Sequence, residues 1–148
     1  MASRRIFEVV MECLGLTGGG DDKNGTTSSS TSGGVVLEKA SIDEFFLDVT
    51  AICKDPSHPL WQTIKNSNLQ EHHQTVVVGH ECERLEDSAG REACRRQALR
   101  SYAAMDRGCQ LAHWIRYSVA SQLGFTLSAG ISVNKMVAKL GASYGKPN

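Results

Sequence analysis

The sequence predicts an α+β fold, in which an antiparallel sheet carries its helices on one face. Three short runs have the apolar and β-branched composition of strands, at residues 35–39, 45–50 and 125–132. Apolar residues recur at helical spacing before the first run, before the third run and after it. The resulting order is helix, strand, strand, helix, strand, helix, and 148 residues is the length of one domain.

The first predicted element is an amphipathic helix. The stretch MASRRIFEVVMECLGL carries its apolar residues on one helical face, formed by Ile6, Val9, Val10 and Cys13. Glu8 and Glu12 interrupt the apolar run, so the stretch is not typical of a secretory signal peptide. No run approaches the apolar length that a membrane span needs, and no membrane partner is expected.

A low-complexity tract follows at residues 17–34, TGGGDDKNGTTSSSTSGG. Its Gly, Ser and Thr side chains can bury little apolar area, so the loss of chain entropy on ordering the tract would not be offset by hydrophobic stabilisation. We expect a disordered insertion within one domain that spans residues 1–148. The GDD triplet in this tract also occurs in some viral RNA polymerases, but there the triplet needs apolar strands on both sides.

The middle of the chain is predicted to change from strands to helices. The strands over 35–39 and 45–50 are followed by loops, a short helix near Trp61 and a short strand at 75–79. Helix formers dominate from residue 81 to residue 123. The clearer apolar face lies in the later part, at Leu111 or Ala112, Ile115, Val119 and Leu123. Gly124 is a good C-terminal stop for this helix.

The third predicted strand, FTLSAGIS at 125–132, alternates apolar with small or polar residues at a period of two. Asn134 is placed to cap a last helix through KMVAKLGASYG. We expect Met136, Val137 and Leu140 to face inward, and Pro147 to end the helix.

Composition excludes several classes of protein. The 16 basic and 16 acidic residues give a formal net charge of zero, so the chain is not a polycation that holds nucleic acid by overall charge. The five cysteines are odd in number, irregular in spacing and without a CxxC. This pattern indicates a reducing compartment, the cytosol or the nucleus, and not a disulfide framework.

Three further patterns favour ordinary structure. His72, His73, His80 and Cys82 match no common zinc spacing. GASYGKPN is one residue short of a phosphate-binding loop and has Pro where that loop has Ser or Thr. ERLEDSAGREACRRQALR alternates charge, which indicates a solvated helix face; the alternative is a DNA-backbone patch of Arg91, Arg95, Arg96 and Arg100.

Asp43 and Glu44 are the main candidates for chemistry. They stand side by side in ASIDEFFLDVT, at the junction of two predicted strands. Neighbours on a regular strand point to opposite faces, so the two carboxylates share a site only if the backbone turns there. Two close carboxylates repel each other, and a divalent cation removes that penalty. Such a pair suits Mg²⁺-assisted phosphoryl or nucleotidyl transfer, whereas an arbitrary Asp-Glu pair is a solvated turn.

Two blocks of the sequence resemble the palm of the Y-family DNA polymerases, the translesion enzymes, and most of all the eta-like type. The blocks are SIDEFFLDVT and SAGISVNKMVAKLGASYGKPN, and SRRIFEVVMECLG matches a helix that precedes the acidic block. The resemblance covers 35–50 and 123–148 well and 3–15 less well. It implies a ferredoxin-like palm and template-directed addition of deoxynucleotides past damaged bases, an activity of DNA repair.

The resemblance implies roles for four residues. Asp43 would be a ligand of two catalytic Mg²⁺ ions, and Glu44 would lie beside it near the primer 3′ hydroxyl. Lys146 matches a lysine that contacts the incoming triphosphate, and Lys135 would also lie near phosphates. The implied partners are primer-template DNA, a deoxynucleoside triphosphate and, for the parent enzyme, a sliding clamp. The implied location is the nucleus.

The resemblance also implies that part of the palm is missing. The family has another metal-binding aspartate on an early strand, and Asp21 and Asp22 lack the apolar strand around them that would match it. We therefore expect a palm fragment without its first strand, inactive alone because its two-metal site is incomplete. Two alternatives stay open: a non-catalytic remnant or interaction module, and a nucleotidyl cyclase, a class that lacks the SAGISVNKMVAKL block.

Overall fold

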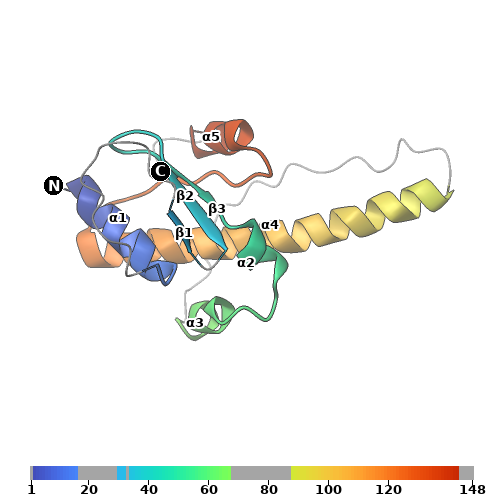
Figure 1. The fold of residues 1–148 in the computed structure, drawn as a ribbon, viewed down its shortest axis with the longest axis horizontal. Coiled ribbons are helices and arrows are strands. Elements are labelled where there is room, and N and C mark those ends of the chain that lie inside the picture. The colour runs from blue at the N-terminus through green and yellow to red at the C-terminus, as the bar shows by residue number, and fades with distance from the viewer. Residues whose placement is uncertain (1, 17–29, 33, 68–87, 144–148) are drawn as a thin grey trace.

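The computed structural model describes residues 2–16, 30–32, 34–67 and 88–143. Within these ranges the chain forms five helices and three strands (Figure 1). In chain order they are α1 (Ala2–Cys13), β1 (Ser30–Ser32), β2 (Val35–Lys39), β3 (Phe45–Asp48), α2 (Thr50–Lys54), α3 (Leu60–Asn66), α4 (Ser88–Leu123) and α5 (Lys135–Ser143). The predicted α+β class is confirmed. The predicted strand at 75–79 and the predicted stop at Pro147 lie outside the described residues.

The three strands form one antiparallel sheet in the order β1-β2-β3. Leu37 pairs with Leu47 and Glu38 with Phe46, which fixes the register of β2 against β3. β1 comes from the tract whose composition predicted disorder, and it differs from that expectation because Ser30–Ser32 pairs with β2 through its backbone. The other residues of the tract, apart from Gly34, lie outside the described ranges.

One face of this sheet faces the core. Along β2, Val35 and Leu37 are buried, whereas Val36 and Glu38 between them are half-buried. Side chains alternate across a strand, so this pattern separates a core face from an outer face. Phe45 and Leu47 of β3 pack on the core side, in agreement with the register.

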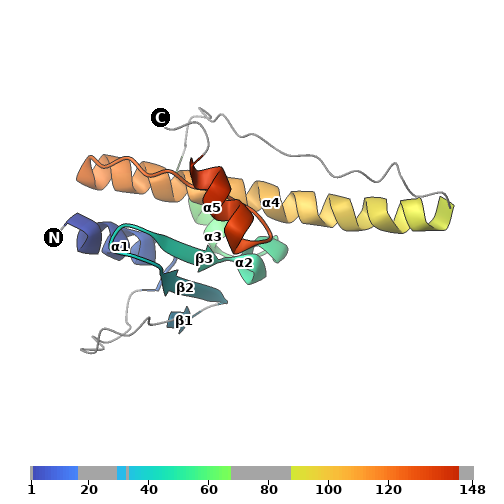
Figure 2. The same ribbon diagram turned by 90° about the horizontal axis from the view of Figure 1, so that it is seen from above.

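The helices α1 to α4 close this core. Figures 1 and 2 show α1 beside the C-terminal part of α4, and the two helices are in contact. The predicted faces are confirmed: Val9, Val10 and Cys13 of α1 are buried, as are Leu111, Ile115 and Val119 of α4. The short helices α2 and α3 add Ile52, Cys53, Trp61 and Ile64. The predicted short helix near Trp61 is therefore also confirmed.

Helix α4 is longer than the group of helices and strands that packs against it. Its N-terminal half extends beyond the other described elements in both views (Figures 1 and 2). It ends where the sequence predicted, since Gly124 adopts a φ of 72° and its N–H donates to Ala120 O at 2.9 Å. None of the helices within the described ranges is long and apolar enough to cross a membrane.

The predicted strand over 125–132 is wrong, because these residues form no β-ladder. The segment is held by α4 and α5 instead of by a strand. The guanidinium Nε of Arg116 donates to Leu127 O at 2.7 Å, and a Cβ built on Gly108 would lie 3.2 Å from Ile131 Cγ2. An alternating pattern indicates that a segment can form a strand. A strand also needs a neighbouring strand to pair with, and the pattern does not show whether one is present.

The predicted inward face of α5 is also wrong. Met136, Val137 and Leu140 are exposed, with 72%, 53% and 66% of their surface accessible, and α5 buries none of its residues. The half-buried positions on α5 are Ala138 and Ala142. A Cβ on Gly130 would overlap the backbone of these two residues, so the segment before α5 packs tightly against the small-residue side of the helix.

Candidate functional site

Asp43 and Glu44 lie in the tight turn between β2 and β3. The backbone therefore changes direction at these residues, which is the condition for the two acids to share a site. The N–H groups of Ala40 and Ser41 both donate to Glu44 O, at 3.0 and 3.1 Å. This turn brings the two acids to one end of the hairpin, and both are exposed. The carboxylates can therefore meet a ligand from solvent without moving the core.

Ser41 shapes the acidic turn from within. Its hydroxyl Oγ donates to Asp43 Oδ1 at 2.7 Å and accepts the N–H of Glu44 at 3.1 Å. One side chain thus orients the Asp43 carboxylate and fixes the backbone from which Glu44 extends. The turn is also tied to α1, because the hydroxyl of Ser3 donates to Ile42 O at 2.5 Å.

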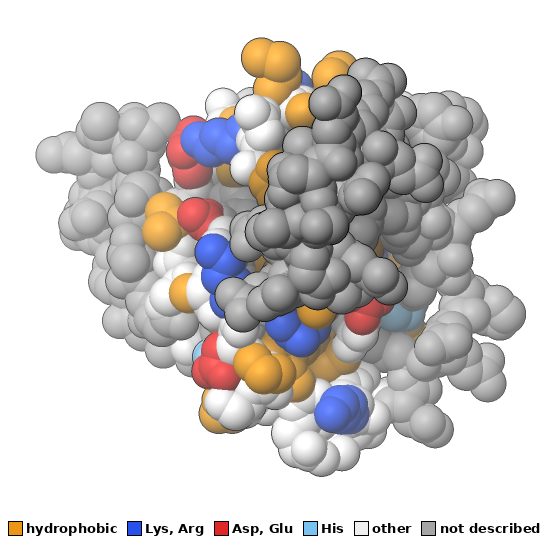
Figure 3. All heavy atoms as spheres, turned by 90° about the vertical axis from the view of Figure 1, so that its right-hand side faces the viewer, with side chains coloured by type: hydrophobic (Ala, Val, Ile, Leu, Met, Phe, Trp, Pro, Cys, Tyr) orange, Lys and Arg blue, Asp and Glu red, His pale blue; other side chains and the backbone are white. Residues whose placement is uncertain are grey.

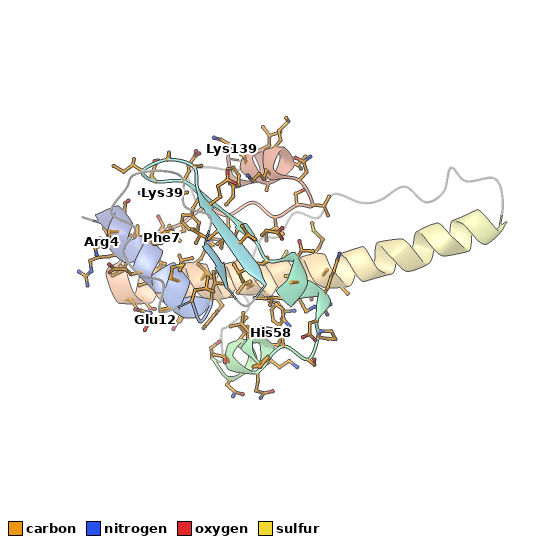
Figure 4. The ribbon with its side chains drawn as sticks, in the orientation of Figure 1. Arg4, Phe7, Glu12, Lys39, His58 and Lys139 are labelled. Carbon is orange, nitrogen blue, oxygen red and sulfur yellow. The ribbon has the colours of Figure 1, made fainter. Side chains whose placement is uncertain are left out.

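A lysine of α5 pairs with the second acid. Lys139 Nζ lies 3.0 Å from Glu44 Oε2, and both side chains are about half exposed, at 57% and 49%. Figure 4 shows Lys139 on the side of α5 toward the hairpin. In this arrangement one oxygen of the candidate metal ligand is already engaged by a cation.

Lys135, one turn earlier on α5, contacts the same hairpin. Its Nζ forms an ion pair with Glu38 and lies 5.2 Å from the centroid of the Phe46 ring. Glu38 and Phe46 pair across β2 and β3 on the outer face of the sheet, opposite the core. Helix α5 therefore reaches the outer face, whereas α1 to α4 cover the inner one.

The donor set at the turn has the chemistry that Mg²⁺ prefers. This ion is commonly held by one or two carboxylates together with waters and substrate phosphates, and Asp43 and Glu44 offer such oxygens in an accessible position. In the part of the chain that the structure describes, no group of three or more His, Cys, Asp or Glu is placed to hold a metal. Two carboxylates fit an open site, not a closed protein cage.

The structure brings together three of the four predicted site residues and adds two more. Asp43, Glu44 and Lys135 meet around one hairpin, while Lys146 lies outside the described ranges. Sequence reasoning missed Glu38 and Lys139. The only available signal for Lys139 was its spacing of four from Lys135, which places both lysines on one side of a helix.

Comparison with known proteins gives the family. A model of the impB/mucB/samB family matches residues 28–143, which include the acidic turn and α5. DNA polymerase eta of Arabidopsis thaliana is 32% identical over 117 residues, covering 74% of this chain and 17% of that protein. DNA polymerase IV of Acetivibrio thermocellus is 36% identical over 62 residues, covering 42% of this chain and 16% of that protein.

The chain therefore spans about one sixth of the length of these curated relatives. No solved structure matches it. The family match covers most of the chain and contains the first of the two resembling blocks and the second block up to residue 143. The chain belongs to the impB/mucB/samB family, that of the Y-family DNA polymerases.

Proposed function

We propose that this chain is part of the palm of a translesion DNA polymerase, which adds deoxynucleotides to a primer on damaged templates. The observation that carries the proposal is the exposed Asp43-Glu44 pair, held in a hydrogen-bonded turn at one end of a β-hairpin. This turn lies inside the segment that matches the family model. Nucleotidyl transfer depends chiefly on positioning and charge neutralisation, and an ordered pair of accessible carboxylates serves both.

Each site residue has a distinct role in this proposal. Asp43, oriented by Ser41, and Glu44 would hold Mg²⁺, with Glu44 nearer the primer 3′ hydroxyl. Bound Mg²⁺ supplies neutralisation of the charge on the triphosphate and on the attacking oxygen. Lys146 would contact the triphosphate and Lys135 would lie near phosphates of the nucleotide or of the DNA, each as a point charge. The role of Lys146 rests on the resemblance of the KPN segment alone.

The proposed partners follow from the same reaction. They are primer-template DNA and a deoxynucleoside triphosphate, with a sliding clamp for the parent polymerase. The proposed place of action is the nucleus, and the proposed process is DNA repair. The similarity to DNA polymerase eta of Arabidopsis thaliana supports the DNA and nucleotide partners.

A second candidate function is a non-catalytic interaction module. The observation in its favour is that the described residues offer two carboxylates at the turn and no group of three metal-binding side chains. A two-metal site normally needs more protein ligands than this pair supplies. In that case the chain would use the palm fold for binding, without nucleotide addition.

Primer extension by the native protein that contains this chain distinguishes the two functions. With Mg²⁺, a primed template and all four deoxynucleoside triphosphates, we expect extension that Asp43→Asn abolishes. Ser57→Ala, on the α2–α3 connection, is the matched control and should extend normally. Extension that survives Asp43→Asn would remove the polymerase role of the turn, and template binding without any extension would favour the interaction module.

A further inference from the structure

Helix α5 is attached to the hairpin mainly by charge. Within the described residues, its ion pairs with the hairpin are Lys139–Glu44 and Lys135–Glu38, and all four side chains are between 43% and 59% exposed. Exposed ion pairs contribute little to stability because water and salt screen them. The attachment is therefore weak and open to competition by other charges.

The rest of α5 adds little hydrophobic anchoring. The apolar face of the helix, Met136, Val137 and Leu140, is exposed, and α5 has no buried residue. Figure 3 shows hydrophobic side chains at the top of the molecule, the level at which α5 lies in Figure 1. Ala138 and Ala142 touch Gly130 of the preceding segment, which is itself held on α4, so this contact ties α5 to α4 and leaves its attachment to the hairpin to the two ion pairs.

We infer that Lys139 and a divalent cation compete for the Glu44 carboxylate, so that metal binding at the acidic turn releases α5 from the hairpin. The inference rests on the proposed function, because it takes Asp43 and Glu44 as the metal-binding pair. Lys139 Nζ is 3.0 Å from Glu44 Oε2, so a cation on this carboxylate would stand within a few ångströms of the ammonium group. Like charges at that separation repel each other.

The competition gives Lys139 a positioning role. Without metal, its ammonium group pairs with the Glu44 carboxylate and offsets the negative charge that this acid adds to the turn. When metal binds, the ammonium group of Lys139 loses its carboxylate partner and becomes free to contact a phosphate group. Coupling between two equilibria is reciprocal, so release of α5 must raise the affinity of the turn for metal.

The test combines a binding measurement with hydrogen exchange on the full chain. Mn²⁺ serves as the probe, and its free concentration is measured by electron paramagnetic resonance. We expect Mn²⁺ to speed amide exchange in residues 138–143 of the wild type. Lys139→Gln should show fast exchange without metal and bind Mn²⁺ roughly 1.4- to five-fold more tightly, the range of one exposed ion pair. Lys139→Arg should restore both wild-type properties.

Two controls isolate the effect. Arg4→Gln removes the exposed Arg4–Glu8 pair on α1 and should leave both Mn²⁺ affinity and exchange in α5 unchanged. Asp43→Asn should lower Mn²⁺ affinity, which locates the ion at the turn. If Mn²⁺ binds in an Asp43-dependent manner while Lys139→Gln changes neither affinity nor exchange, the competition is refuted and the proposed function stands. If neither wild type nor Lys139→Gln binds Mn²⁺ through Asp43, both the competition and the metal-binding role of the turn are refuted.

Discussion

Ser41 is the residue on which the geometry of the acidic turn depends most directly. Its hydroxyl donates to Asp43 Oδ1 and accepts the N–H groups of Asp43 and Glu44, so Ser41→Ala removes hydrogen bonds from both acids. Exposed hydrogen bonds contribute about 0.5–1.5 kcal/mol, and we expect the free energy of unfolding to fall by about that amount. Urea denaturation measures this loss, and titration with Mn²⁺ should show weaker binding because Asp43 is no longer oriented.

The matched control for Ser41 is Ser57, whose hydroxyl donates to Asp55 Oδ1 at 2.6 Å in a similar two-residue arrangement. Ser57→Ala should cost comparable stability and leave Mn²⁺ affinity at the wild-type value. Equal Mn²⁺ affinities for the two variants would show that Ser41 does not orient the candidate ligand.

Asp48 links the stability of the hairpin to pH. Hydrogen bonds from the hydroxyl and the backbone N–H of Thr50 hold the pKa of Asp48 below its ordinary value. A carboxyl group with a lower pKa in the folded state stabilises the fold above its unfolded pKa, and this contribution is lost as pH falls through the folded pKa. Asp48→Asn should therefore flatten the acid side of the stability curve, below about pH 4.

Urea unfolding of wild type and Asp48→Asn across the acid range measures this difference. The gap between their free energies of unfolding should narrow as pH falls, and the effect should be modest because Asp48 is exposed. A gap that stays constant with pH would mean that Thr50 does not stabilise the ionised form.

At the scale of elements, Gly130 controls how α5 meets the segment before it. A Cβ at this position would overlap the backbone of Ala138 and Ala142. Gly130→Ala should therefore force the segment and α5 apart and speed amide exchange within α5. Because α5 buries no residue, global stability should fall far less than it does when a core residue is truncated. Ala129→Ser, at the exposed neighbouring position, is the control and should leave exchange in α5 unchanged.

Elements that depend on local signals were predictable from the sequence. Asn134 caps α5 as expected, since its Oδ1 accepts the N–H of Met136 at 2.8 Å. The end of α4 at Gly124 is predictable from the residues beside it. The buried faces of α1 and α4 are predictable from the spacing of apolar residues within each helix, because each face only needs some apolar surface to pack against. These features follow from residues within one or two helical turns of one another.

Elements that depend on a distant partner were not predictable in the same way. The alternation of 125–132 shows which side chains would share a face, but a strand forms only beside another strand, and these residues lie against α4 and α5. The apolar stripe of α5 predicted a buried face without saying what would cover it. The acidic turn was found because its residues are contiguous, whereas Lys139 was missed because it is 95 positions from Glu44.

At the scale of the whole molecule, charge is balanced and dispersed. The 16 basic and 16 acidic residues cancel, and Figure 3 shows acidic and basic side chains side by side on the face that it presents. Among the described residues, Arg4, Lys135 and Lys139 are each paired with a glutamate. Since phosphate contacts dominate affinity for DNA, this chain alone should bind primer-template DNA weakly and with a shallow dependence on salt.

Freeing the two lysines of α5 should make DNA binding stronger and more sensitive to salt. Glu38→Gln with Glu44→Gln leaves Lys135 and Lys139 without their partners and changes the formal net charge from zero to +2. If both lysines then contact phosphates, the slope of log K against log salt should steepen by about 1.8, as measured by fluorescence anisotropy. Glu8→Gln with Glu12→Gln makes the same change of net charge on α1, away from the hairpin, and should steepen the slope less. Equal slopes for the two double variants would mean that DNA senses only the net charge, and that the surface formed by α5 and the acidic turn is not where the duplex lies.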